Sequence, residues 1–132
     1  QTFNRALKLW LLSVCGGIIM LMGCQYFYHI WIGNKVLVPF TVSLSTFIYV
    51  SFFNLNNCVT YLINGLNKIR IQIITSLVIT ATYVLTIMSM GKQLGIEGIV
   101  LCMAASYAVM SLIHLYQCKL LIKGKATGIW NK

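Results

Sequence analysis

Four long apolar segments follow one another along the chain, separated by short polar stretches. They cover roughly residues 9–32, 37–62, 71–90 and 98–118. A helix that rises 1.5 Å per residue needs about 20 apolar residues to cross a ~30 Å hydrocarbon layer. Lipid offers no partner for unpaired backbone groups, so each segment is expected to be α-helical. The pattern therefore predicts four transmembrane helices.

The connections between these segments are short and rich in turn-forming residues. They fall at 33–35, 64–68 and 91–95, where Gly, Asn and Lys gather. Pro39 is placed in the first turn of the second helix, where its missing N–H costs little. Connections this short force neighbouring helices to run antiparallel. The predicted fold is an all-α integral membrane protein, an up-down bundle of four transmembrane helices with a tail at 119–132.

The composition supports lipid as the solvent. Hydrophobic residues make up 59% of the chain and charged residues 8%, and the mean hydropathy is +0.85. Soluble domains carry about 25% charged residues. The net charge of +9 would suggest nucleic acid in a soluble protein, but here the cations lie only between and beyond the apolar segments. Membrane topology explains them better, and no nucleic-acid partner is expected.

The cations divide unequally between the two ends of the predicted bundle, with eight on one side and two on the other. Cytoplasmic loops carry the excess of Lys and Arg in membrane proteins. Both termini are therefore expected on the cytoplasmic side of a multi-pass protein. The eight cations are Arg5, Lys8, Lys68, Arg70, Lys119, Lys123, Lys125 and Lys132, and the two are Lys35 and Lys92.

The second segment carries a polar face. From Asn54 onward, polar residues recur at spacings of three and four, which places them on one side of a helix. Burying an amide in hydrocarbon without a partner costs about 2–7 kcal/mol, so this face must meet protein or water. Two interpretations remain open, interhelical hydrogen bonding and the lining of a water-filled cavity. The residues proposed to line a substrate cavity are Asn54, Asn57, Tyr61, Asn64, Lys68 and Arg70.

Lys68 and Arg70 themselves have two interpretations. They either orient the protein at the inner membrane surface or form a cationic mouth that attracts phosphate. The opposite side of the second segment is mainly apolar, although Ser45 and Asn56 also point that way.

The last two segments carry weaker polar patterns. The third has a row of amide and hydroxyl residues, and the fourth has a stripe of small residues suited to close helix packing. His29 and His114 are expected to make interfacial or interhelical contacts. The row is Gln72, Thr75, Thr82, Thr86 and Ser89; the stripe is Ala104, Ala108 and Ser111, with Tyr107 and His114 on a nearby face.

Motifs for chemistry are missing from the sequence. No Asp or Glu lies within a predicted span, because Glu97 is the only acidic residue and falls at the edge of a connection. The five cysteines are scattered and fit small buried apolar positions rather than metal ligands or disulfides. No phosphate-binding loop, zinc motif or nucleophile elbow occurs. We therefore expect no enzyme activity, no catalytic residue, no cofactor and no bound metal.

Four stretches together resemble a known family. They are Tyr28–Gly33, Tyr61–Gln72, Leu94–Ile99 and the tail Lys125–Lys132. In order and spacing they resemble the last four helices of bacterial polysaccharide flippases, which belong to the multidrug/oligosaccharidyl-lipid/polysaccharide exporter superfamily. The resemblance covers essentially the whole chain, and the tail is its most distinctive element.

This resemblance implies a role in transport. Such flippases have twelve or fourteen helices in two lobes and lie in the bacterial inner membrane. They move lipid-linked oligosaccharides, usually undecaprenyl-pyrophosphate repeat units, across it by alternating access for O-antigen, capsule or exopolysaccharide synthesis. The implied partners are the bilayer, this substrate and the remaining helices of the transporter. The chain begins Gln-Thr-Phe, so we expect it to be one part of a longer protein.

Two other functions stay open at this stage. One is a multidrug or small-molecule exporter, either as a fragment or as a complete four-helix protein. A complete exporter would need its own coupling group, and no membrane carboxylate is present. The other is a membrane scaffold subunit without transport activity, in which the polar faces serve only as helix contacts.

Overall fold

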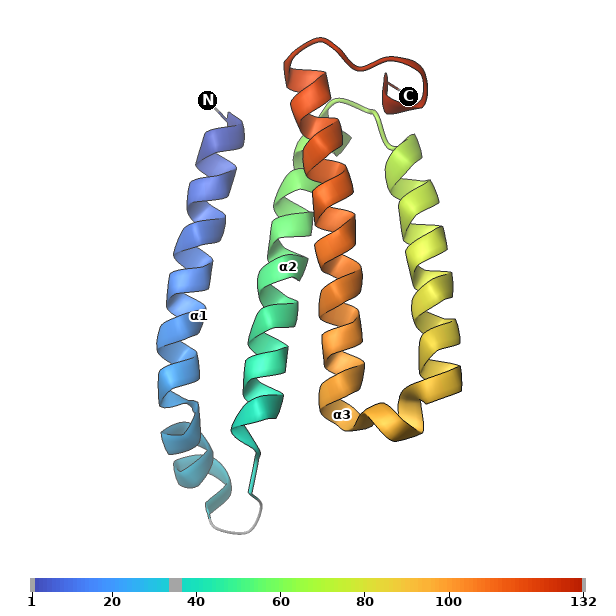
Figure 1. The fold of residues 1–132 in the computed structure, drawn as a ribbon. Coiled ribbons are helices and arrows are strands. Elements are labelled where there is room, and N and C mark those ends of the chain that lie inside the picture. The colour runs from blue at the N-terminus through green and yellow to red at the C-terminus, as the bar shows by residue number, and fades with distance from the viewer. Residues whose placement is uncertain (1, 34–36, 132) are drawn as a thin grey trace.

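The described part of the chain is helical almost throughout (Figure 1). The computed structural model describes residues 2–33 and 37–131. Within these ranges the elements are α1 (Thr2–Ile32), α2 (Phe40–Gly65), α3 (Arg70–Ile122) and a short 3-10 helix, η2 (Gly128–Asn131), with no strand. The all-helical class predicted from the apolar segments is confirmed.

The third helix folds back on itself. Gly95 has φ 62° and ψ −175°, whereas the rest of α3 is helical. Residues 70–94, the first arm, and residues 96–122, the second arm, therefore run in opposite directions (Figure 1). The expected connection at 91–95 is too long, because residues 91–94 remain helical and a single glycine makes the break. Glycine permits a backbone conformation that other residues rarely adopt.

Several helix ends differ from the predicted bounds. α1 begins at Thr2 instead of residue 9, so the basic residues near its start lie within the helix. α2 begins at Phe40, because Pro39 has an extended backbone (φ −61°, ψ 137°) directly before it and not inside its first turn. α2 ends at Gly65 and α3 continues to Ile122, each beyond the apolar segment. The connection expected at 33–35 lies mostly outside the described residues.

The core lies where α2 packs between α1 and the second arm of α3. Its buried cluster consists of Leu55, Val59, Ile63 and Cys118. Trp10 of α1 packs against this cluster, and its indole Nε1 donates a hydrogen bond to the Ser51 carbonyl of α2 at 2.8 Å. The core is therefore a small interhelical seam.

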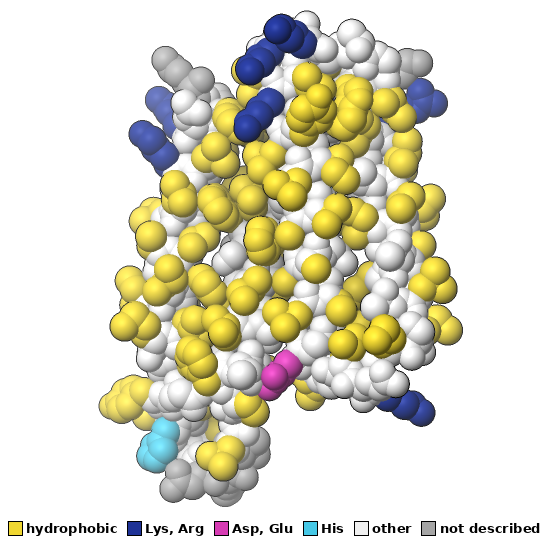
Figure 2. All heavy atoms as spheres, in the orientation of Figure 1, with side chains coloured by type: hydrophobic (Ala, Val, Ile, Leu, Met, Phe, Trp, Pro, Cys, Tyr) yellow, Lys and Arg dark blue, Asp and Glu magenta, His cyan; other side chains and the backbone are white. Residues whose placement is uncertain are grey.

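Most of the helical surface is apolar and exposed, as Figure 2 shows for one face. α1 and α3 are both long and apolar enough to cross a membrane, yet only 6% and 17% of their most apolar stretches is buried. The core helix of a soluble protein would bury most of such a stretch. α2 does not reach the same apolarity, because three asparagines fall between residues 54 and 57. The structure thus confirms apolar helices that are long enough to cross a membrane. Within the described residues, α1 and α3 meet this criterion, in place of the four separate segments that the sequence predicts.

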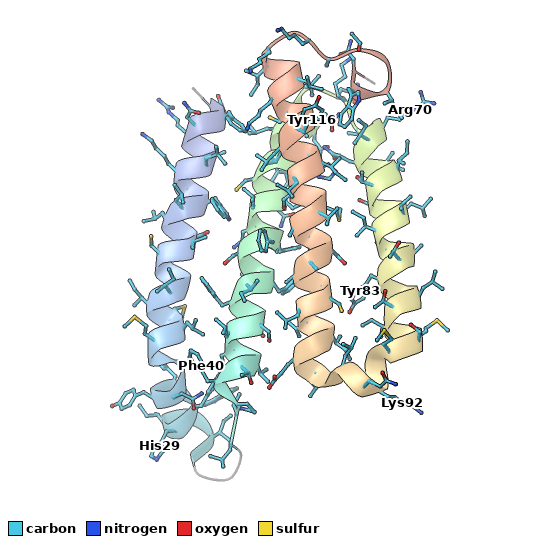
Figure 3. The ribbon with its side chains drawn as sticks, in the orientation of Figure 1. His29, Phe40, Arg70, Tyr83, Lys92 and Tyr116 are labelled. Atoms are coloured by element: carbon cyan, nitrogen blue, oxygen red, sulfur yellow. The ribbon has the colours of Figure 1, made fainter. Side chains whose placement is uncertain are left out.

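The described cations gather at one end of the molecule, with Lys92 at the other (Figures 2 and 3). This end combines the start of α1, the α2–α3 connection and the end of α3. Lys35 and Lys132 lie outside the described residues. Glu97 lies at the opposite end, where the Thr41 hydroxyl donates a hydrogen bond to it.

Candidate functional site

A cluster of polar side chains lies buried between α2 and the two arms of α3. At its centre is His114, which is 1% exposed. Its Nδ1 lies 2.8 Å from the Asn56 Oδ1 and 3.4 Å from the Thr60 Oγ1. Its Nε2 lies 3.0 Å from the Thr75 Oγ1, which is within the usual hydrogen-bond range. One imidazole therefore joins three helical segments.

The partners of His114 define its hydrogen-bonding roles. A carboxamide oxygen can only accept, so the imidazole Nδ1 carries the hydrogen donated to Asn56. The Nε2 atom can then accept from the Thr75 hydroxyl. The single hydrogen of the Thr75 hydroxyl is shared between this nitrogen and the Ile71 carbonyl of its own helix, 2.7 Å away. A neutral imidazole fits the contacts on both sides of the ring. The cluster is thus a helix-joining network, and the expectation of interhelical contacts for His114 is confirmed.

A second polar layer lies one helical turn nearer the cationic end. The Gln117 Nε2 donates to the Lys68 carbonyl at 3.0 Å. Within the described residues, the Gln117 Oε1 and the Gln72 Nε2 are buried and have no hydrogen-bond partner. Unsatisfied buried groups cost about 1–3 kcal/mol each, and ordered water commonly satisfies them. This layer is therefore suited to hydration.

The small-residue stripe of the second arm brings that arm close to α2. Ala104 and Ser111 are 3% and 1% exposed. The Ser111 hydroxyl lies 2.7 Å from the Tyr107 carbonyl of its own helix and 3.2 Å from the Phe52 carbonyl of α2. Small side chains let helix backbones approach in this way. The predicted close packing at this stripe is confirmed.

The predicted cavity face of α2 lies away from this buried cluster. Asn54 and Asn57 are half-buried, Asn64 is exposed and Tyr61 is 74% exposed. The neighbouring Asn56 is buried. Within the described chain, this face is therefore partly covered at Asn54 and Asn57 and exposed at Tyr61 and Asn64.

The two predicted cationic residues lie at the cationic end, in different surroundings. The Lys68 ammonium donates to the Asn131 carbonyl of the tail at 2.8 Å. The Trp130 ring meets Tyr116 of the second arm edge-on, with centroids 5.2 Å apart. Arg70 begins α3 and is exposed (Figure 3). The tail thus folds back over the α2–α3 connection and accepts a hydrogen bond from Lys68, whereas Arg70 remains accessible.

Comparison of the chain with protein-family models, curated proteins and solved structures finds no match. The flippase resemblance is therefore a prediction from the residues alone.

In the hydroxyl row on the first arm, the threonine hydroxyls all bond carbonyls of their own helix, at 2.7 Å for Thr75 and 2.9 Å for Thr82 and Thr86. Of these three, Thr75 also contacts His114. Two shallow hollows of about 330 and 290 Å³ lie between the arms, and Tyr83 lines both (Figure 3). Because these hydroxyls are already satisfied, the row offers little to a polar ligand.

Two important members of the buried cluster were missed from the sequence. Asn56 was placed on the apolar side of α2, and Gln117 was not singled out. A signal was present, since Ser111, His114 and Gln117 recur every three residues on one helix. Asn56 and Thr60, four apart on α2, offered the matching polar side. Pairing the two rows would have predicted the contact.

Proposed function

We propose that this chain is the C-terminal part of a bacterial inner-membrane flippase for lipid-linked oligosaccharides used in polysaccharide export. In this proposal α1, α2 and both arms of α3 cross the membrane, and both termini are cytoplasmic. The missing lobe of the transporter faces α2. The chain contributes a wall of the substrate path and no catalytic group.

The observation that carries the proposal is the incompletely covered polar face of α2. Asn64 is exposed and Asn54 and Asn57 are half-buried, and an amide that meets hydrocarbon without a partner costs about 2–7 kcal/mol. Within the described residues, neither α1 nor α3 covers this face completely. A hydrated groove between two lobes satisfies such a face and gives a glycan polar walls, while the lipid tail of the substrate remains in the bilayer.

Helix length and surface character support the membrane placement. α2 has 26 residues, which corresponds to about 39 Å, and each arm of α3 has a similar length. The hydrocarbon core is ~30 Å thick. The exposed apolar side chains include Met22 at 82% and Met88 at 80%, which suit lipid contact. The gathering of cations at one end supports a cytoplasmic position for that end.

In this proposal, Arg70 and Lys68 at the cationic end have different roles in binding phosphate. Arg70 is exposed and available for the first contact with a pyrophosphate, and its planar guanidinium suits bidentate contacts with phosphate. The Lys68 ammonium is held by the tail carbonyl of Asn131. A pyrophosphate would therefore have to displace the tail to reach Lys68.

Thiol labelling of the full-length protein tests whether the polar face of α2 meets water. In a background without native cysteines, Asn57→Cys should react with a water-soluble, membrane-impermeant thiol reagent. Leu85→Cys on the first arm is the matched control, because Leu85 is 67% exposed on an apolar surface and should face lipid. Equal protection of both positions in every transport state would favour the scaffold function.

An export assay tests the function itself. Asn54→Leu and Asn57→Leu should reduce surface polysaccharide while the protein remains inserted at normal abundance. Leu85→Met, a conservative change on the apolar surface, should have no effect. Normal export by a doubly substituted Asn54→Leu/Asn57→Leu protein would contradict the proposal. Loss of drug resistance with normal polysaccharide export would favour a multidrug exporter.

A further inference from the structure

A cleft opens between the three helices at the cationic end. The start of α1, the end of α2 and the end of α3 enclose about 500 Å³. Its walls are mainly apolar and include Phe3, Leu62, Leu66, Cys118 and Ile122. Leu66 and Ile122 are 51% and 59% exposed, so the cleft is open to the surroundings. An apolar chain can enter it from the side.

Cations flank this cleft on the side of α3. On α1, Arg5 and Lys8 are exposed but lie two and five residues from Phe3, on the side of the helix turned away from Phe3. Lys119 and Lys123 are exposed on α3, each next to a residue of the cleft wall. Figure 2 shows basic side chains at this end on both α1 and the end of α3. The sole acidic residue of the chain lies at the other end, so no carboxylate neutralises this rim.

We infer that this cleft binds an anionic phospholipid from the leaflet that meets the cationic end. One acyl chain lies in the cleft against Leu62 and Leu66, and the phosphate lies at the ammonium groups of Lys119 and Lys123. Basic residues at a membrane surface attract anionic headgroups, and basic pockets between helices bind them specifically.

The chemistry of the walls favours a phospholipid over the proposed transport substrate. A glycan needs polar side chains along its path, whereas the polar residues that line this cleft are Thr2 and Asn4 at its outer edge. The polar face of α2 points elsewhere. The cleft therefore combines a small charged rim with an apolar interior, which matches a headgroup and acyl chain.

The inference rests on the membrane placement in the proposed function and not on transport, so a binding measurement tests it separately. The full-length protein is purified in detergent and examined by native mass spectrometry with phosphatidylglycerol or phosphatidylcholine of identical acyl chains. We expect phosphatidylglycerol to be retained on the order of tenfold better, because only it carries a net negative charge.

Two variants and one control locate the site. Lys119→Gln combined with Lys123→Gln should weaken phosphatidylglycerol binding on the order of tenfold. Leu66→Trp should fill the cleft and reduce binding while leaving the charge unchanged. Lys92→Gln removes an exposed cation at the opposite end and should leave binding unchanged. Circular dichroism establishes that each variant is folded.

Three results would overturn the inference. The first is equal retention of the two lipids by the unaltered protein. The second is equal binding by the folded Lys119→Gln/Lys123→Gln and Lys92→Gln variants. The third is displacement of phosphatidylglycerol by an equimolar amount of undecaprenyl pyrophosphate, which would assign the cleft to the substrate. A protein that stays folded and monomeric without detergent would instead contradict the membrane placement.

Discussion

The imidazole Nδ1 of His114 donates a hydrogen bond to the amide Oδ1 of Asn56, 2.8 Å away, inside the packed helices. The two residues are 1% and 5% exposed, so water does not compete for this bond. This bond connects the second arm of α3 to α2. The same imidazole also contacts Thr75 and so connects the two arms of α3. His114 therefore contributes both to the hairpin fold of α3 and to its packing against α2.

Breaking this pair should destabilise the helices. Asn56→Leu leaves the His114 donor without its acceptor and should lower the free energy of unfolding by about 1–3 kcal/mol. Substituting both residues by leucine should cost less than the sum of the single changes, because no orphaned group remains. Unfolding of the full-length protein in detergent measures all three variants. Strict additivity would contradict the coupling.

Gly95 should resist substitution for conformational reasons alone. An added Cβ would meet nothing within 4 Å, yet its φ of +62° disfavours any side chain. Gly95→Ala should therefore destabilise the protein by about 1–3 kcal/mol. Gly16→Ala is the control, because Gly16 is helical and also has open space around it. That change should be neutral or stabilise by up to ~1 kcal/mol, and equal thermal shifts would contradict the account.

Gly17 should resist substitution for steric reasons. A Cβ there would lie 2.7 Å from the Phe47 ring of α2. Gly17→Ala should separate α1 from α2 and cost about 1–3 kcal/mol, as overpacking does elsewhere. Adding Phe47→Leu should restore much of the lost stability by making room. If Gly17→Ala melts at the same temperature as Gly16→Ala, the two helices do not pack through this position.

The contact between Trp130 and Tyr116 should hold the tail in place. An aromatic pair contributes about 0.5–1.5 kcal/mol, so Trp130→Ala should speed hydrogen exchange in residues 128–131 by up to about tenfold. Trp31→Ala is the control, because Trp31 is 84% exposed near the other end of the bundle. Faster exchange in the tail of that control, or unchanged exchange in Trp130→Ala, would show that the aromatic pair does not anchor η2.

The helices could be predicted from the sequence because apolar run length is a local property. The helix ends were harder to predict, since each depends on the backbone conformation of a single residue. Pro39 permits a helix after it but takes an extended backbone here, and residues 91–94 continue a helix that looked broken by Gly91. A break at one glycine cannot be located by hydropathy when two glycines lie four residues apart.

The polar cluster was only partly predictable. A helical repeat shows which residues share a face, but not which face meets which helix. Asn57 and Asn56 are adjacent, yet Asn57 stays partly exposed, whereas Asn56 is buried and contacts His114. Choosing between them needs the packing of α2 against α3, which depends on contacts more than 50 residues apart.

The single-glycine break in α3 has a consequence for biosynthesis. In the proposed membrane placement, both arms, which are joined without a loop, insert as one helical hairpin in which each arm shields polar side chains of the other. On that proposal, the charged residues of this hairpin to be carried through the bilayer are Lys92 and Glu97, which lie close to the turn and are opposite in charge.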